Sequence, residues 1–433
     1  MQSGSFTCPW VRFESSDRGA TLMPKSLVAG RVAEIPFAGI RKVFEKAASM
    51  EAQGRKVIHF EIGRPDFDTP SHIKKAAMKA LERGMVHYTP NAGVMKLREA
   101  IAASIFDYKG IRYDPNSEVM VTAGGQEAMY LSLQAILEPG DEVLVPDPGY
   151  SQFYSCVRLL GGVAIPMPCL SHDNACPDLE AARTLVSGKT RAIIINSPHN
   201  PTGGVLSGKQ LEGICQFTEE HDLILLSDEA YDHLIYDGAH FVSPASFPDM
   251  KERTFIWGSL SKTYAMTGWR IGYLAAPAPV VAACIKIQQN LLLSVCSFAQ
   301  AGAVAAIEGS QDCVDAMVRE FDQRRKIVLS ALTRIPGVTC PTIPRGAFYV
   351  FVKHQVTGMD SMAIAEALLE KGKVALVPGS SFGFRGEGYL RLSYAASTED
   401  CREGMARIGR VMEELMDSTK NLQRPYESLF KRP

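Results

Sequence analysis

The sequence predicts an α/β protein with two domains. The large domain has a mainly parallel, helix-covered sheet, and the smaller domain is of the α+β type. Between residues 118 and 262, short apolar runs alternate with segments of helical periodicity, which is the pattern of a parallel sheet covered by helices. Polar residues follow several of these runs directly, at the strand ends where open α/β sheets place ligands. Beyond residue 279 longer helical segments and separated strands replace the alternation, which predicts the second domain.

Composition limits the partners that we expect. The chain has 433 residues, of which 46% are apolar and 21% charged, so a full-sized buried core is expected. A formal net charge of −1 gives no electrostatic reason to expect nucleic acid or an anionic membrane. The ten cysteines form no C-x-x-C pair, and no run approaches the roughly 18 apolar residues of a membrane span. We therefore expect a cytoplasmic enzyme with reduced thiols, without a metal, nucleic-acid or membrane partner.

The chain is divided into four parts by changes in its pattern. Residues 1–33 are expected to be an N-terminal arm or extension, because they contain charges and prolines but no apolar core of a secretory signal. A large domain is expected over 61–299. A small domain is expected from two segments, 34–60 and 300–417. Residues 418–433 lose helical periodicity, and we expect a tail that frays.

The first elements predicted are a helix over 38–53, a short strand at 57–62 and a helix near 71–83. Gly63 follows the strand and would let the backbone approach a ligand closely, while Pro65 prevents the ladder from continuing. An ordinary turn explains these two residues as well. The next loop carries Tyr88, which is expected to be exposed.

A double glycine follows the apolar run Glu118–Thr122 and precedes a helical segment. Gly124, Gly125 and Gln126 lie at this junction. The free N–H groups of a helix N-terminus and the helix dipole attract an anion, so the junction is a candidate phosphate cradle. A double glycine before a helix is common, so this signal is weak by itself.

Further strands are predicted at 142–146, 163–167, 191–196 and 222–227, and three of them end in notable side chains. Tyr150 could stack on a planar cofactor or simply be a core residue. Asn200 lies in the rigid turn Ser-Pro-His-Asn-Pro-Thr-Gly-Gly. Asp228 would be costly to bury without a partner, and a protonated pyridine nitrogen is such a partner.

One lysine among hydroxyls follows the apolar run Arg253–Trp257. Ser259, Ser261 and Lys262 are followed by Arg270, eight positions after the lysine. A lysine amine forms a Schiff base with an aldehyde, while hydroxyls and a guanidinium hold a phosphate. A phosphate-bearing aldehyde with a pyridine ring suggests pyridoxal phosphate. The alternative is a solvated surface lysine.

The last part of the chain predicts the small domain. Residues 279–333 are largely helical, a strand is expected at 345–351, and a helix at 361–371 precedes a short extended segment. Arg391 lies within the apolar strand 389–394, and a closing helix is expected over 398–417. An unpaired buried guanidinium at 391 would be costly, and a carboxylate ligand would remove that cost.

The order and spacing of these motifs resemble the fold-type I, class I/II pyridoxal-phosphate-dependent aminotransferases over about residues 34–417. The matching motifs are Gly63-x-Pro-Asp-Phe, Tyr88, Gly124-Gly125, Tyr150, Asn200-Pro-Thr-Gly, Asp228-x-Ala-Tyr231, Ser259-x-Ser-Lys262, Arg270 and Arg391-Leu-Ser-Tyr. The resemblance implies pyridoxal phosphate held as an internal aldimine, a homodimer with shared active sites, and transfer of the amino group of an L-amino acid to a 2-oxo acid.

The resemblance also implies a role for each matching residue. Lys262 would carry the aldimine and move the proton, Asp228 would pair with the pyridine nitrogen, and Tyr231 and Asn200 would donate to the ring hydroxyl oxygen. The remaining cofactor contacts would be Tyr150 on the ring, and Gly124, Gly125, Gln126, Ser259 and Arg270 on the phosphate, with Tyr88 reaching the phosphate of the neighbouring subunit. Arg391 would hold the substrate α-carboxylate, with help from Gly63 and Asn200.

Two further functions stay open at this point. A protein of the same fold could carry out elimination, cyclisation or oxidation of an amino acid with the same cofactor-binding residues. A non-catalytic ligand-binding protein on the same scaffold is the alternative of another class. Gln126 stands where some relatives that use dicarboxylates carry a cation, which makes aspartate a less expected main substrate. Arg64 could bind an acidic side chain or be solvated.

Overall fold

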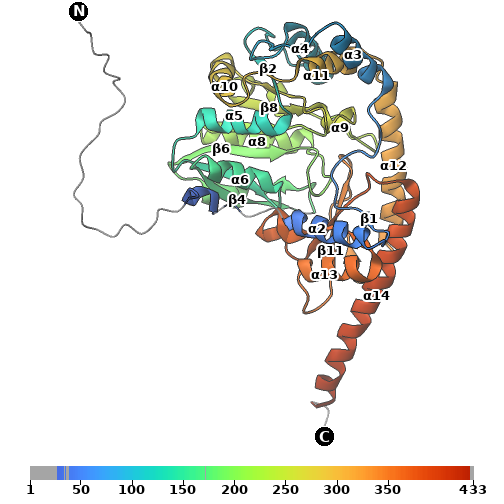
Figure 1. The fold of residues 1–433 in the computed structure, drawn as a ribbon. Coiled ribbons are helices and arrows are strands. Elements are labelled where there is room, and N and C mark those ends of the chain that lie inside the picture. The colour runs from blue at the N-terminus through green and yellow to red at the C-terminus, as the bar shows by residue number, and fades with distance from the viewer. Residues whose placement is uncertain (1–26, 34, 36–38, 171, 430–433) are drawn as a thin grey trace, which may run out of the picture.

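The computed structural model describes residues 27–33, 35, 39–170 and 172–429. Most of the predicted arm, residues 1–26, lies outside them, and the described part of the arm includes the short helix α1 (Gly30–Ala33). Figure 1 shows the large domain above and the small domain below, with the helices α12 (Asp312–Leu332) and α14 (Thr398–Leu429) along one side.

The large domain is built on an eight-stranded sheet in the order β2-β9-β8-β7-β6-β3-β4-β5. The central strands β8, β7, β6, β3 and β4 are parallel, whereas β9 is antiparallel to both of its neighbours and β5 is antiparallel to β4. The strand bounds are β2 (Val119–Thr122), β3 (Glu142–Asp147), β4 (Val163–Leu170), β5 (Cys176–Pro177), β6 (Thr190–Asn196), β7 (Ile224–Asp228), β8 (Thr254–Ser259) and β9 (Gly272–Ala275).

The apolar runs form central strands because both faces of the sheet are covered. Ile194 and Leu226 point into one core, where they pack with α5 (Gly125–Ile136), α6 (Ser151–Leu159) and α10 (Ala278–Leu291). Their neighbours Ile193 and Leu225 point into the opposite core with α7 (Leu179–Leu185) and α8 (Gly208–Glu220). This alternation is the period of two of a β-strand with each face buried.

A third core packs on the β2 end of the sheet, against side chains of β2, β9 and β8. It joins α3 (Ser71–Glu82), α4 (Met95–Lys109) and α11 (Ser297–Glu308), with Ala299 and Ala303 of α11 packed against Ile73 of α3. The domain boundary predicted at residue 300 falls inside α11, and α11 packs on α3 and α4 of the large domain.

The small domain has a four-stranded sheet in the order β10-β11-β14-β13 and a two-stranded piece, β1-β12. Its core contains Phe348, Val350, Leu392 and Tyr394, and α12 and α14 pack on it. The bounds of its elements are α2 (Gly39–Ala52), β1 (Ile58–His59), β10 (Val338–Thr339), β11 (Tyr349–His354), α13 (Ser361–Ala367), β12 (Val374–Ala375), β13 (Val377–Pro378) and β14 (Tyr389–Ser393).

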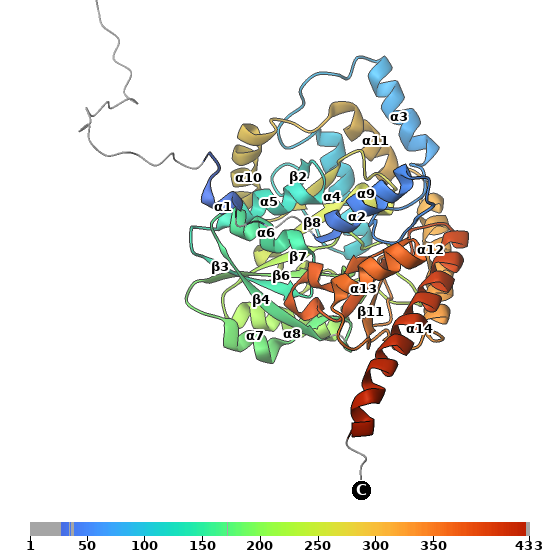
Figure 2. The ribbon, with the colours of Figure 1, turned by 60° about the horizontal axis from the view of Figure 1, so that its bottom comes forward.

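The last helix is longer than the sequence pattern predicts. α14 runs to Leu429, past the predicted helix end at residue 417, and both ribbon views show it projecting beyond the small domain (Figures 1 and 2).

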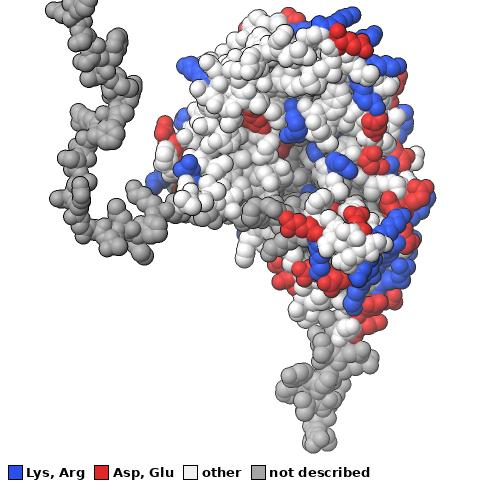
Figure 3. Space-filling view, viewed as in Figure 1, with Lys and Arg blue, Asp and Glu red and all other residues white. Residues whose placement is uncertain are grey.

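The surface shows no separation of charge on the face seen in Figure 3. Blue and red side chains alternate, most densely over the region of α12 and α14, while much of the rest of the face in view is uncharged. In the part of the chain that the structure describes, no helix is long and apolar enough to cross a bilayer.

Candidate active site

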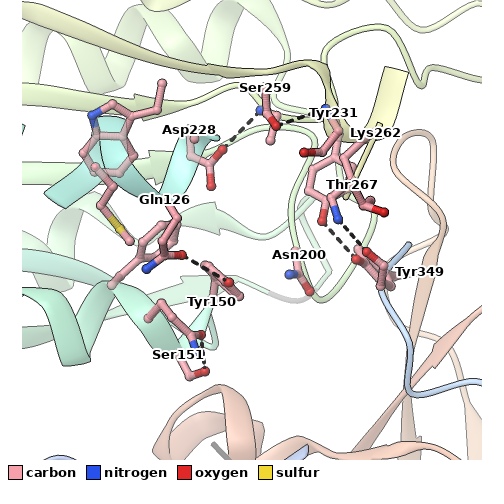
Figure 4. A pocket seen from close by; sticks show the side chains of 18 of the residues that line it. Gln126, Tyr150, Ser151, Asn200, Asp228, Tyr231, Ser259, Lys262, Thr267 and Tyr349 are labelled. Atoms are coloured by element: carbon pink, nitrogen blue, oxygen red, sulfur yellow. Dashed lines mark hydrogen bonds between the residues drawn. The ribbon is translucent and has the colours of Figure 1, made fainter. Parts of the chain in front are cut away.

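The carboxyl ends of β2, β3, β6, β7 and β8 meet at one edge of the large sheet and face the small domain across a cavity of about 350 Å³. Eleven of the predicted site residues line it: Gly63, Gly125, Gln126, Tyr150, Asn200, Asp228, Tyr231, Ser259, Lys262, Arg270 and Arg391. Figure 4 shows several of these side chains directed toward one another from different strands. The sheet topology therefore collects residues that are far apart in the sequence.

Lys262 lies in α9 (Leu260–Thr263), the short helix directly after β8. Its Nζ donates a hydrogen bond to the carbonyl oxygen of Gly63 at 2.5 Å. Burial lowers the pKa of Lys262 to about 8, with Arg391 and Arg270 lowering it further and Asp228 opposing them. An amine with this pKa is partly neutral near physiological pH, and the neutral form is the nucleophile.

Asp228 is the last residue of β7. Its Oδ1 accepts a hydrogen bond from the backbone N–H of Ala230 at 3.1 Å. Burial raises the pKa of Asp228 to about 7; the Ala230 N–H and Lys262 oppose this rise, and Glu229 and Asp232 add to it. A cation in the cavity would favour the ionised carboxylate, so the position suits a positively charged ring nitrogen.

An anion cradle lies between the start of α5 and Arg270. Gly124 has φ 81°, and a Cβ there would lie 2.5 Å from Nη2 of Arg270, so this position requires glycine. Arg270 itself has a left-handed φ of 53°, and its guanidinium donates to the carbonyl oxygens of Thr267 and Ala123 at 3.1 and 3.3 Å. The hydroxyls of Ser259, Ser261 and Thr267 also line the cavity. Hydroxyls, helix N–H groups and a guanidinium together suit a phosphate.

Arg391 reaches the cavity from β14 of the small domain. Its Nη1 donates to Oδ1 of Asn200 at 3.1 Å, and its Nη2 donates to the carbonyl oxygen of Glu61 at 2.7 Å. The guanidinium lies between two aromatic rings, 4.4 Å from the centroid of Tyr349 and 5.0 Å from that of Phe382. Within the described chain its buried Nε has no hydrogen-bond partner. A carboxylate could supply one.

A partly buried ion pair lies next to the segment that accepts from this arginine. The side chain of Glu61 is fully buried, and its Oε1 lies 2.7 Å from Nδ1 of His59. Nε2 of His59 lies 3.0 Å from Glu51 of α2. The hydrogen bond to Glu61 raises the pKa of His59, against the effect of burial, to about 9. His59 therefore ties the segment that accepts from Arg391 to the small domain.

Two predicted residues do not line the cavity. Gly124 lies beside it and makes room for Arg270. Tyr88 lies in the loop before α4 with 84% of its surface exposed, and it is not among the described residues that line the cavity. Arg64, a candidate for binding an acidic side chain, lines a separate cavity with Lys56, His59 and Asp400.

The structure adds residues that the sequence did not single out as site residues. Tyr349 of β11 places its Oη 2.9 Å from Oη of Tyr231, and Phe382 covers Arg391. A Cβ on Gly63 would collide with the Tyr349 hydroxyl, so Gly63 permits this approach. Both aromatic residues come from the small domain, where the apolar pattern only indicated core, and no motif marked them.

The residues present fit pyridoxal phosphate. The cavity holds an amine of lowered pKa at Lys262, a buried acid without a cationic partner at Asp228, and a phosphate cradle whose glycine admits Arg270. Tyr150 stands on the large-domain wall, with its hydroxyl 3.4 Å from Oε1 of Gln126. The aldehyde, ring nitrogen, ring face and phosphate of the cofactor would each meet a suitable group in this cavity.

Comparisons with known proteins agree with this geometry. A family model described as "Aminotransferase class I and II" matches residues 55–408. An aspartate aminotransferase of Pyrococcus abyssi is 43% identical over 378 residues, 87% of this chain and 95% of the relative. An aromatic-amino-acid aminotransferase of Thermococcus litoralis is 41% identical over the same shares. The solved structure of an aromatic aminotransferase from Pyrococcus horikoshii superposes with a TM-score of 0.81 and 42% identity, covering 85% of this chain and 99% of that one.

Proposed function

The chain belongs to the class I and II aminotransferases, enzymes that depend on pyridoxal phosphate, and from this premise we propose what each residue of its cavity does. The observation that carries the proposal is the meeting of Lys262, Asp228 and Arg391 in one cavity, from α9, β7 and β14. Lys262 would hold the cofactor covalently. Gly125, Gln126, Ser259 and Arg270 would hold its phosphate, with Gly124 making room, while Tyr150, Asn200 and Tyr231 would contact its ring.

When bound, pyridoxal phosphate supplies an aldehyde that exchanges amino groups and a ring that accepts electrons as the substrate α-proton leaves. Lys262 Nζ, with its lowered pKa, is the base that would take this proton and return it. Asp228 would keep the ring nitrogen protonated. Arg391 would bind and orient the substrate α-carboxylate, so that the bond to be broken is held in place. Tyr349 and Phe382 would exclude water from the carboxylate site.

The substrate class follows from the cations that line the cavity. In the described chain these are Lys262, Arg270 and Arg391, and the roles above use all three. Gln126 is neutral, and its Oε1 and Nε2 already contact Tyr150 and Cys156. Within one chain of the proposed dimer, a second substrate carboxylate would therefore meet no free cation among the described residues, and without a cation it would lose solvation uncompensated. We expect L-amino acids with uncharged side chains, aromatic ones included, to be better amino donors than aspartate.

This preference can be tested by mixing the enzyme, with pyridoxal phosphate bound, with one amino acid at a time and without an amine acceptor. Phenylalanine and leucine should each form their 2-oxo acid in stoichiometric amount, with kcat/KM at least about tenfold above that of aspartate, a difference of about 1.4 kcal/mol. Glutamine and glutamate form a matched pair that differs in side-chain charge, and glutamine should be the better amino donor of the two. An enzyme that favours aspartate over phenylalanine would contradict the proposed substrate class. Ammonia released in place of a bound amine would contradict amino transfer.

We further propose that the enzyme is a homodimer whose active sites are shared. Tyr88 is 84% exposed in the single chain, and apolar residues near it in sequence and at or just after the end of α10 are exposed as well: Val86, Leu291, Leu292 and Leu293. Exposed apolar side chains of this size support an interface with another copy. An interface there would bring Tyr88 to the phosphate cradle of the partner.

Hybrids of two inactive variants test the sharing. Tyr88→Asp places a negative charge where a phosphate would lie, and Lys262→Ala removes the amine. In a statistical mixture, half of the dimers are hybrids with one intact site, so about a quarter of the parent activity should return. The matched control mixes Lys262→Ala with Asp228→Asn, whose two residues line the cavity of the same chain, and should recover nothing. Verified hybrids of the first pair without activity would remove Tyr88 from the site.

A cytoplasmic location is also proposed. It is supported by the nine cysteines of the described chain, all of which are free thiols and five of which are buried. Reduced thiols are usual for proteins of a reducing compartment.

A further inference from the structure

The end of β7 and the turn after it carry three acids within five positions: Asp228, Glu229 and Asp232. Asp228 lines the cavity together with Tyr231, three positions later. Glu229 and Asp232, also three positions apart, are buried on the other side, where both meet the same cation. The turn therefore directs one pair of side chains to the site and the other pair away from it.

The cation behind the turn is Lys109, the last residue of α4. Its Nζ lies 2.7 Å from Oε2 of Glu229 and 2.7 Å from Oδ2 of Asp232, and its side chain is only 2% exposed. Burial alone would lower the pKa of Lys109, but Asp232 and Glu229 hold it well above the ordinary value. The ammonium thus remains charged and compensates two buried carboxylates.

The two acids differ in their other partners. Oε1 of Glu229 accepts from the hydroxyls of Ser227 at 3.0 Å and Ser243 at 2.6 Å. Among the described residues, Oδ1 of Asp232 accepts from the backbone N–H of His233 alone, at 3.0 Å. Glu229 therefore keeps two strong donors without Lys109, whereas Asp232 depends on it more heavily.

The other titratable groups around this cluster stay uncharged at mildly alkaline pH. Tyr113 follows α4, Tyr264 follows α9, and Tyr273 lies on β9; burial raises the pKa of each. Tyr108 of α4 donates to the carbonyl oxygen of Asp232 and stacks on the ring of His233; burial raises its pKa as well. Lys109, Glu229, Asp232 and Asp228 are the Lys, Asp and Glu side chains of this cluster.

We propose that Lys109 is a positioning residue for the aminotransferase reaction: its buried ammonium neutralises the acids behind the turn and so keeps Asp228 ionised toward the ring nitrogen of the cofactor. The proposal rests on the role of Asp228 proposed above. With Lys109 present, Glu229 and Asp232 leave one net negative charge behind Asp228. Without it they leave two once both are ionised. Asp228 is the direct chain neighbour of Glu229, so this charge would raise the proton affinity of Asp228 more than that of the ring nitrogen beyond it. The proton between the two would then move from the nitrogen to Asp228, with the net charge of that pair unchanged.

Nitrogen-15 NMR of pyridoxal phosphate labelled at the ring nitrogen tests the proposal, because the shift reports the proton on that atom directly. Four variants are loaded and titrated from pH 7.5 to 9.5: Lys109→Met, Lys109→Met with Asp232→Asn, Asp232→Asn, and Asp228→Asn. The double variant loses one positive and one negative charge, so its net charge behind Asp228 is again −1, as in the parent. The remaining charge lies on Glu229, which keeps both of its serine donors. Unfolding midpoints of all four are measured in parallel.

We expect the ring nitrogen of the parent to stay protonated over this range. The nitrogen of Lys109→Met should pass its proton to Asp228 as the pH rises and both acids behind the turn become ionised. The double variant should give the parent signal although it also lacks the Asp232 carboxylate. The ring nitrogen should remain protonated in Asp232→Asn alone. Turnover of Lys109→Met should fall about tenfold at pH 9, and less at pH 7.5.

A parent-like signal in Lys109→Met would overturn the proposal. So would a double variant that is no better than Lys109→Met, because Lys109 would then act only by holding the turn. If Lys109→Met does not fold, loss of the ring proton in Asp232→Asn overturns it instead. A ring nitrogen that stays protonated in Asp228→Asn would overturn the role of Asp228 and this inference with it. If the ring nitrogen loses its proton in Asp228→Asn but keeps it in Lys109→Met, only the inference is overturned.

Discussion

Replacing Lys262 with alanine should lower kcat/KM by at least about ten-thousandfold, equivalent to roughly 5 kcal/mol of barrier. The substitution removes both the amine that would hold the cofactor and the only base among the described residues of the cavity whose pKa lies near 8. General acid–base catalysis alone accounts for about a hundredfold to ten-thousandfold. Steady-state kinetics with phenylalanine and a 2-oxo acid measure the loss.

The matched control is Lys286→Ala. Lys286 is an exposed lysine of α10 and lines neither cavity described here, so its kcat/KM should stay within about twofold of the parent. Circular dichroism and the unfolding midpoint of Lys262→Ala should match those of the parent. A Lys262→Ala enzyme with a tenth or more of the parent activity would mean that another group moves the proton.

Replacing Asp228 with asparagine should leave the cofactor bound but lower kcat by about a hundredfold or more, roughly 3 kcal/mol. Lys262 and the phosphate cradle are unchanged, so absorbance of the bound cofactor should persist. The neutral amide cannot hold a proton on the ring nitrogen as a carboxylate does. Burial raises the pKa of Asp228 to about 7. The same burial excludes water that could otherwise take the place of the carboxylate beside the ring nitrogen.

Two further variants serve as a rescue and a control for this result. Asp228→Glu restores a carboxylate and should regain part of the lost rate, whereas Asp107→Asn changes an exposed acid on α4 and should behave like the parent. Turnover of Asp228→Asn at the parent rate would show that Asp228 is structural and that another acid faces the ring nitrogen.

The sequence predicted the large domain well because its central strands are buried on both faces. Runs such as Ile193–Ile195 are apolar at every position, which distinguishes them from helices and loops. β9 and β5 were not predicted, because β9 (Gly-Tyr-Leu-Ala) begins with a glycine and β5 has only two residues. The strand order could not be predicted either, because it depends on packing between segments far apart in the sequence.

The site was predictable where a polar residue directly follows an apolar strand. Asp228 and Lys262 were found in this way. Tyr349 and Phe382 were not, because an aromatic residue in an apolar segment of the small domain looks like core until the domains are placed face to face. The pairing of Lys109 with Glu229 joins residues 120 positions apart, and no local pattern connects them. The role of Tyr88 depends on a second chain and stays a prediction.

Borohydride reduction of the loaded enzyme followed by peptide mapping tests the attachment of the cofactor to Lys262. The reduction converts the reversible C=N link between cofactor and lysine into a stable bond, so the labelled peptide identifies the lysine. We expect the pyridoxyl group on the peptide that contains Ser259, Ser261 and Lys262, and none in Lys262→Ala treated in the same way. A label on any other lysine of the parent enzyme would contradict the site and every role assigned around it.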